Sequence, residues 1–212
     1  YEPGSIFKPV TMAIGLEEGK ITPEATYRDP GEIKIGGWVI KNYEERKYPG
    51  EISMTEVLEK SINTGAVFVQ QKIPKEIHLE YLKKFGVFEK TNIDLPEIVA
   101  SNSEIKKMRD ITFATISFGQ GIALTPIQLA RIFSALINGG KLVTPHLNSN
   151  LKVEKSPQVI SKETSEKLQK MLVSVVENGF AKRAKIPGYF IGGKTGTALQ
   201  PAFGQKGYSQ KT

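Results

Sequence analysis

The chain has 212 residues, enough for one sizeable domain, and no cysteine, which excludes disulfides and thiolate metal sites. Its 39% hydrophobic and 24% charged residues are ordinary for a globular protein, and no uncharged run is apolar enough to span a bilayer. The net charge of +7 permits binding to polyanions, but basic residues alternate with glutamate along helical stretches such as 163–170. We therefore expect a solvated basic surface and no nucleic-acid binding.

Apolar periodicity, helix caps and glycine stop signals predict that most of the chain is helical. The predicted helices cover residues 5–16, 53–61, 64–72, 75–85, 125–138 and 161–179. Thr125 begins its helix most clearly, because proline follows at the first helical position and glutamine at the third. Ser53 and Glu56 form a capping box, and Ser61 falls near the break before the third helix.

Strand signals are few. Residues 33–35 and 38–40 flank a Gly-Gly pair and predict a short hairpin, and residues 189–197 are predicted to form one further strand. Because the strands do not alternate with the helices, the pattern predicts an α+β domain rather than a doubly wound sheet.

Three short patterns hold residues that could carry chemistry, and each is weak alone. They are Ser5–Lys8 (S-x-x-K), Ser61–Asn63 (S-x-N) and Lys194–Gly196 (K-T-G). S-x-x-K also occurs at Ser103 and Ser149, but only Ser5 begins an apolar helix that could bury its lysine. Burial or a second cation lowers the pKa of a lysine enough for it to act as a base, and Lys194 is the candidate cation.

Two other chemistries are disfavoured. Residues 188–195 fit the P-loop pattern G-x-x-x-x-G-K-[ST], but Tyr189 and Phe190 are too bulky for a phosphate-binding loop, and no helix is signalled after Thr195. The only histidines, His78 and His146, have no suggestive neighbours and are expected to be ordinary surface or loop residues. A Ser-His-Asp triad and a metal site are therefore not expected.

The patterns and their flanks together resemble the penicillin-binding protein transpeptidase family, and more narrowly its class B, monofunctional members. The resembling segments are Tyr-Glu-Pro-Gly-Ser-x-Phe-Lys, Lys-Ser-Ile-Asn-Thr-Gly, Ser-Phe-Gly-Gln-Gly-Ile-Ala-Leu-Thr-Pro-Ile-Gln-Leu-Ala and Gly-Lys-Thr-Gly-Thr-Ala. The resemblance implies a penicillin-binding or serine β-lactamase-like fold, with helices packed on an antiparallel sheet that is incomplete here. It further implies one partial transpeptidase domain over residues 1–212, with flanking strands and an N-terminal domain or anchor absent.

By this resemblance, Ser5 is the nucleophile that attacks a D-Ala-D-Ala stem peptide and forms an acyl-enzyme, and Lys8 accepts its proton. Ser61 passes a proton to the leaving amine, and Asn63 orients Lys8 and the substrate amide. Lys194 supplies positive potential. Asparagine at position 63 favours the septal type over the elongation type, whose members often carry aspartate there.

The resemblance also places Thr195, Gly196 and Thr197 at the substrate carboxylate, with the backbone N–H groups of Ser5 and Thr197 as the oxyanion hole. Residues 119–121 match a family loop near the site, although a flexible turn explains them nearly as well. Phe180 departs from the family, since many relatives have a small hydroxyl residue there.

The implied partners are peptidoglycan stem peptides, β-lactam antibiotics and a membrane-anchored division or elongation complex, with no cofactor. The implied location is the bacterial cell envelope, at the extracytoplasmic face of the cytoplasmic membrane. A D,D-carboxypeptidase, a β-lactam sensor domain and a non-catalytic module of a wall-building complex stay open as alternatives. A β-lactamase is disfavoured, because no Glu-x-x-Leu-Asn segment is present.

Overall fold

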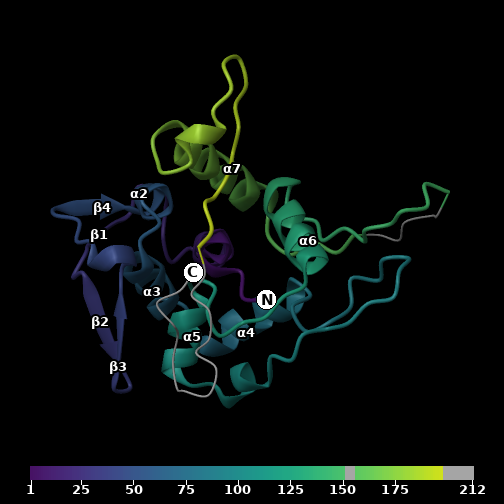
Figure 1. Ribbon diagram of the computed structural model, residues 1–212, viewed down its shortest axis with the longest axis horizontal. Helices are drawn as coiled ribbons and strands as arrows, with labels where there is room; N and C mark the ends of the chain where they lie inside the picture. Colours follow the sequence, from purple (N-terminus) through teal and green to yellow (C-terminus); the bar gives the residue numbers. More distant parts are fainter. Residues whose placement is uncertain (151–155, 198–212) are drawn as a thin grey trace.

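The computed structural model describes residues 1–150 and 156–197. Its elements in chain order are η1 (Gly4–Phe7), α1 (Lys8–Glu17), β1 (Thr26–Arg28), β2 (Glu32–Ile35), β3 (Trp38–Lys41), η2 (Tyr43–Glu45), β4 (Glu51–Ser53), α2 (Met54–Glu59), α3 (Asn63–Gln71), α4 (Lys75–Lys84), η3 (Ser103–Lys107), α5 (Asp110–Ile116), α6 (Pro126–Ile137), α7 (Lys162–Glu177) and η4 (Lys182–Ala184), where η marks a 3₁₀ helix. Helices dominate and the strands form two separate antiparallel pairs, as Figure 1 shows, which confirms the α+β class. Within the described ranges no helix is long and apolar enough to cross a membrane.

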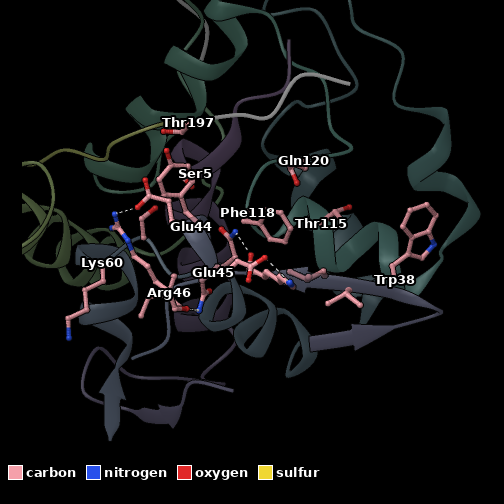
Figure 2. Close-up of a pocket in the computed structure, with 18 of the residues that line it drawn as sticks. Ser5, Trp38, Glu44, Glu45, Arg46, Lys60, Thr115, Phe118, Gln120 and Thr197 are labelled. Carbon is pink, nitrogen blue, oxygen red and sulfur yellow. Dashed lines mark hydrogen bonds and ion pairs between the residues drawn. The ribbon is translucent and has the colours of Figure 1, made fainter. Parts of the chain in front are cut away.

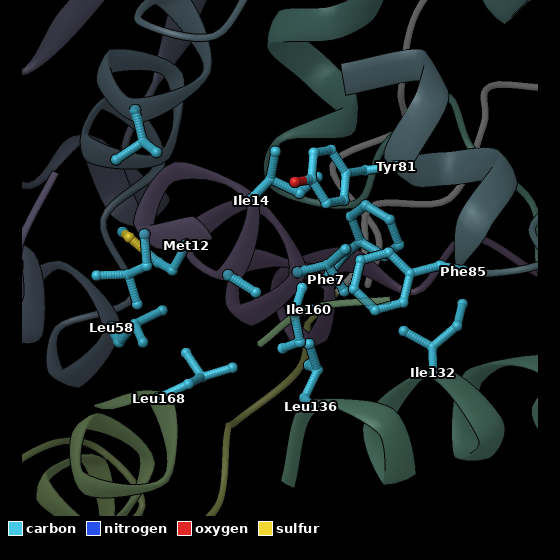
Figure 3. Close-up of a cluster of buried hydrophobic side chains, with 14 of the residues drawn as sticks. Phe7, Met12, Ile14, Leu58, Tyr81, Phe85, Ile132, Leu136, Ile160 and Leu168 are labelled. Carbon is cyan, nitrogen blue, oxygen red and sulfur yellow. The ribbon is translucent and has the colours of Figure 1, made fainter. Parts of the chain in front are cut away.

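Helix α1 is the centre of the core, because every residue from Lys8 to Leu16 is buried. It packs against α2, α3, α6 and α7. The large apolar side chains gathered around it, shown in Figure 3, include Phe7, Met12, Ile14, Leu58, Tyr81, Phe85, Ile132, Leu136, Ile160 and Leu168. Burying each such side chain contributes roughly 1.5–3 kcal/mol, so α1 is held firmly from all sides.

The predicted helix caps are confirmed. Ser53 Oγ accepts from the backbone N–H of Glu56 at 3.2 Å while the Glu56 carboxylate accepts from the Ser53 N–H at 2.9 Å. Thr125 and Gln128 repeat this arrangement at the start of α6. The helix predicted from Ser5 begins instead as the 3₁₀ turn η1, and the α-helix starts at Lys8.

The hairpin prediction is also confirmed, since β2 and β3 pair with Ile35 opposite Trp38. The two residues between them, Gly36 and Gly37, have φ values of 54° and 83°, which a two-residue turn of this kind requires at both positions. The pair of β1 with β4 was not predicted, because three-residue strands are too short to show alternation.

The prediction of a strand at residues 189–197 is wrong for this structure. The segment joins no ladder in the described part of the chain, and the N–H of Gly193 donates instead to the carbonyl of Leu172 at 3.1 Å. Phe190 is 92% exposed. Strand-forming residues alone do not make a strand, because a neighbouring backbone must pair with their N–H and C=O groups.

The prediction that both histidines lie at the surface or in loops is wrong for His78. This residue lies in α4 and is fully buried, with its ring edge against Phe113 at 5.5 Å between centroids. It occupies the same helix face as Tyr81 and Leu82, three and four residues on, and that face turns to the core. His146 is exposed, as expected.

Replacing His78 by leucine is expected to weaken the pH dependence of stability. Burial lowers the pKa of His78 from its ordinary value of 6.5 to about 4. Above pH 6.5 the ring is neutral in the folded and unfolded chains alike. As the pH falls toward 4 only the unfolded chain takes up the proton, so wild-type stability should fall by about 2 kcal/mol between pH 7 and pH 5 from this residue.

Urea unfolding of the full-length natural protein at pH 7 and pH 5 measures this difference. Because other groups also titrate, wild type and variant are compared at both pH values. His146→Gln is the matched control and should keep the wild-type pH dependence, since His146 is exposed. An equal fall in the free energy of unfolding for wild type and His78→Leu would contradict the prediction.

Candidate active site

The candidate nucleophile and its lysine are paired by the local backbone. Ser5 lies in η1, and Lys8 follows as the first residue of α1. In a 3₁₀ turn the side chains at positions i and i+3 are nearly eclipsed, so the two side chains meet. Lys8 Nζ lies 2.9 Å from Ser5 Oγ, within hydrogen-bond distance.

Ser61 is a second hydrogen-bond partner of Lys8. It lies between α2 and α3 with φ at 53°, a left-handed conformation that is uncommon for a residue other than glycine. Lys8 Nζ donates to the Ser61 carbonyl at 2.7 Å and to Ser61 Oγ at 3.1 Å. Such backbone strain recurs at functional sites, where the surrounding structure maintains it.

Lys194 completes the group. Its Nζ donates to Ser61 Oγ at 2.8 Å and to the carbonyl of Thr195 at 3.0 Å. The Ser61 hydroxyl therefore lies between two amines. Because a hydroxyl accepts two hydrogen bonds and donates one, it can relay a proton between Lys8 and a group in front of it.

Burial sets the charge state of the two lysines. Full burial, with the nearby Lys194 charge as a second cause, holds the pKa of Lys8 well below its ordinary range. Burial alone lowers the pKa of Lys194 to about 8. A neutral Lys8 amine has a free lone pair, so it can take the proton of the Ser5 hydroxyl while its N–H groups stay bonded to Ser61.

The K-T-G residues approach Ser5 because position 196 is glycine. A β-carbon there would lie 2.4 Å from Ile6 Cγ1, so a side chain at 196 would push the segment away from η1. Thr195 and Thr197 line the same cleft as Ser5. The structure thus brings together Ser5, Lys8, Ser61 and Lys194, with the two threonines beside them, and gives Gly196 a packing role.

The cleft has a volume of about 1240 Å³, and Figure 2 shows Thr197 and Ser5 near one another with Trp38 at the far side. Some lining residues were not predicted by any motif. Among these, the Arg46 guanidinium lies 5.7 Å from the ring centre of Tyr43 and 5.3 Å from that of Phe180, and it is paired with Glu44. The signal available in the sequence for these lining residues was an arginine three residues after a tyrosine, in the short segment that follows the predicted hairpin.

Asn63 lines the cleft but is not among the hydrogen-bond partners that the described residues offer to Lys8. Its side-chain amide donates to the carbonyl of Lys41 at 2.9 Å. The resemblance implies that Asn63 orients Lys8. In this structure the Ser61 carbonyl accepts the hydrogen bond that orients Lys8.

The other two S-x-x-K patterns and the P-loop pattern do not have comparable neighbouring groups in the described residues. Ser103 and Lys106 are both exposed in η3, and Lys152 of the Ser149 pattern lies outside the described residues. The segment at Lys194 has no regular secondary structure and begins no helix up to residue 197, unlike a P-loop. Over residues 1–150 and 156–197 there is no group of three or more side chains suited to hold a metal ion.

Comparison with known proteins agrees with these features. The family model described as the penicillin binding protein transpeptidase domain matches residues 1–212. A peptidoglycan D,D-transpeptidase FtsI homologue of Mesostigma viride is 34% identical, with the match covering 100% of this chain and 41% of the relative. Stage V sporulation protein D of Bacillus subtilis is 37% identical over 93% of this chain and 33% of the relative. The chain thus spans well under half the length of these relatives.

Solved structures give the same result. The apo TP domain of Burkholderia pseudomallei penicillin-binding protein 3 superposes with a TM-score of 0.87 at 29% identity, over 99% of this chain and 63% of the other. Penicillin-binding protein 3 of Mycobacterium tuberculosis, complexed with aztreonam, gives 0.86 at 29% identity over 99% and 51%. A Ser-x-x-Lys pair, Ser-x-Asn and Lys-Thr-Gly on an α+β scaffold define the class that contains serine β-lactamases and penicillin-binding proteins. This chain belongs to the penicillin-binding protein transpeptidase family, as a class B domain of the septal type.

Replacing Lys194 by glutamine is expected to raise the pKa of Lys8, because the repulsion from the Lys194 charge is removed. The pKa should stay below the ordinary lysine value, since burial is the larger cause. NMR titration of the ¹³C-labelled lysine side chains measures the shift. Lys60→Gln, a change elsewhere in the cleft, is the control and should leave the pKa of Lys8 unchanged. A fall in the pKa of Lys8 in Lys194→Gln would disprove the coupling.

Proposed function

We propose that this protein is a D,D-transpeptidase that cross-links peptidoglycan stem peptides through an acyl-enzyme on Ser5, and that β-lactams trap the same serine. The observation that carries the proposal is the Lys8 amine, which is fully buried and bonded to both Ser5 and Ser61. A buried lysine without a carboxylate partner is costly for stability, and a lowered pKa beside a serine hydroxyl is what nucleophile activation requires.

In the acylation step, Ser5 Oγ attacks the carbonyl carbon of the penultimate D-Ala while Lys8 Nζ takes the hydroxyl proton. The new bond joins Oγ to the carbonyl carbon, and the bond that breaks is the peptide C–N bond to the terminal D-Ala. Ser61 Oγ, between Lys8 and Lys194, hands a proton to that leaving nitrogen. The amine departs neutral, and Lys8 passes the proton that it took from Ser5 on to Ser61 Oγ, so both groups return to their starting protonation state.

Substrate binding is assigned to the cleft wall formed by the K-T-G segment. Thr195 and Thr197 would hold the terminal carboxylate by their hydroxyls, with Lys194 supplying positive potential beside them. The backbone N–H groups of Ser5 and Thr197 would stabilise the oxyanion. One such donor is worth roughly 3–4 kcal/mol in the transition state of comparable enzymes.

The second step consumes the acyl-enzyme. The amine of another stem peptide attacks the ester carbonyl and the C–Oγ bond breaks. The proton that the attacking amine loses passes through Ser61 and Lys8 to Ser5 Oγ, which becomes a hydroxyl again. Attack by water instead would make the protein a D,D-carboxypeptidase, and a persistent β-lactam adduct without peptide turnover would make it a sensor. The relatives named D,D-transpeptidase favour the amine.

The biological setting is inferred from the relatives. Several are named FtsI homologues and one is named a sporulation protein, which favours a role in septal wall synthesis within a division complex. Substrate of this kind lies in the cell envelope, so we place the protein at the extracytoplasmic face of the bacterial cytoplasmic membrane.

The Ser5→Ala variant should form no covalent adduct with benzylpenicillin, because it lacks the proposed nucleophile. Wild-type full-length protein should gain the mass of one benzylpenicillin molecule and keep it for minutes or longer. Intact-protein mass spectrometry after incubation gives both results.

Ser103→Ala and Ser149→Ala are the matched controls, because each removes the serine of another S-x-x-K pattern. Both should acylate like wild type. An adduct that survives in Ser5→Ala, or the absence of an adduct in folded wild-type protein, would overturn the proposed function. Both reactions release D-Ala from a stem-peptide donor, so the remaining product separates them: an amide with an added amine acceptor for transpeptidation, and a shortened peptide acid for hydrolysis.

A further inference from the structure

A second segment of the chain, residues 117–124, is joined to the region around Ser5. We call it the clamp segment. Its bonds to residues 1–11 include those from Thr11 Oγ1 to the Ser117 carbonyl (2.9 Å), from the Gly4 N–H to the Gly119 carbonyl (2.9 Å), from the Gly121 N–H to the Glu2 carboxylate (3.0 Å) and from the Leu124 N–H to the Tyr1 carbonyl (2.9 Å). The clamp segment therefore runs beside the chain on both sides of the nucleophile.

The closest approach is between two glycines. Gly119 is buried with φ at 82°, and a β-carbon on it would lie 2.0 Å from the Gly4 carbonyl oxygen and 2.7 Å from the Gly4 nitrogen. Neighbouring backbone cannot give way as a flexible side chain would. Gly4 itself has φ at 59° and immediately precedes Ser5. No other residue type fits at position 119 without moving the backbone next to the nucleophile.

We infer that Gly119 is a positioning residue for the reaction, acting through Gly4 to set the place of the Ser5 backbone. This inference rests on the proposed function. The Ser5 side chain is already held by Lys8, but its backbone N–H, the proposed oxyanion donor, is held in position through its neighbours. The clamp segment is bonded to the residue on the N-terminal side of Ser5 and, through Thr11, to the helix on the C-terminal side.

A small displacement at this point has a large effect on rate. A misplacement of about 1 Å can cost about a hundredfold in rate, because attack geometry and oxyanion donors must fit the transition state together. Initial binding of a β-lactam depends much less on that fit. The inference therefore predicts a loss in the acylation rate constant rather than in the affinity of the first, non-covalent complex.

The test compares Gly119→Ala with Gly139→Ala, which lies after α6 and outside both the clamp segment and the cleft lining, in the full-length natural protein. Both glycines have positive φ, so alanine strains the backbone at either site, but the nearest atom to a β-carbon on Gly139 among the described residues is Lys162 Cγ, at an ordinary contact distance of 3.8 Å. Stopped-flow acylation by a chromogenic cephalosporin gives the acylation rate constant and the dissociation constant separately. The active fraction is counted from the size of the single-turnover burst.

We expect Gly119→Ala to acylate about a hundredfold more slowly per active site, with the dissociation constant within a fewfold of wild type. Gly139→Ala should stay within a fewfold in both quantities. The pH at which acylation is half-maximal should not move in either variant, because the surroundings of Lys8 are unchanged. Equal slowing in the two variants, or a smaller burst with a wild-type rate, would overturn the positioning role.

Thr11→Val provides a second variant in case Gly119→Ala does not fold. It removes one bond of the clamp segment inside the buried helix and keeps the shape of the side chain. Acylation should slow by about tenfold with unchanged affinity, and a wild-type rate would count against the inference. Failure of the proposed function shows separately, as the absence of a Ser5 adduct in the wild-type protein.

Discussion

The buried Lys8 amine is the group on which the site and the centre of the fold both depend. It lies in the most enclosed helix of the protein and has no exposed surface. A charged ammonium there would cost several kcal/mol to desolvate, so the protein lowers its pKa and surrounds it with oxygen atoms of Ser5 and Ser61. The same burial that would make an uninvolved lysine destabilising gives this one the lowered pKa that the proposed role as a base requires.

Stability and chemistry are therefore linked through α1. The helix carries the lysine on the side that faces Ser61, while its other side chains form the core with α2, α6 and α7. Substitutions that loosen this packing would admit water to Lys8 and raise its pKa, so core changes far from the cleft should affect acylation as well as folding. The strained Ser61 backbone can persist because α2 and α3 hold it from both sides.

Local signals predicted the described α-helices other than α5, which lies in none of the predicted ranges, and they predicted the tertiary environment poorly. The caps at Ser53 and Thr125 could be read directly, because they involve residues three apart. The burial of His78 could not, since a lone histidine on a helix is compatible with either surface or core. The segment at 189–197 has strand-forming residues, but whether it pairs depends on a neighbour that its own sequence does not specify.

The sequence by itself determined which residues are the candidates for the chemistry, because the motifs name Ser5, Lys8, Ser61 and Lys194 in order, and local periodicity places the first two on one helix face. Only the tertiary structure decided how they act. The pKa of a lysine depends on burial and on charges from distant segments, so the lowered pKa of Lys8 follows first from its burial within the fold and second from the nearby charge of Lys194. The clamp at Gly119 is likewise a contact between backbones more than a hundred residues apart, which no local pattern can reveal.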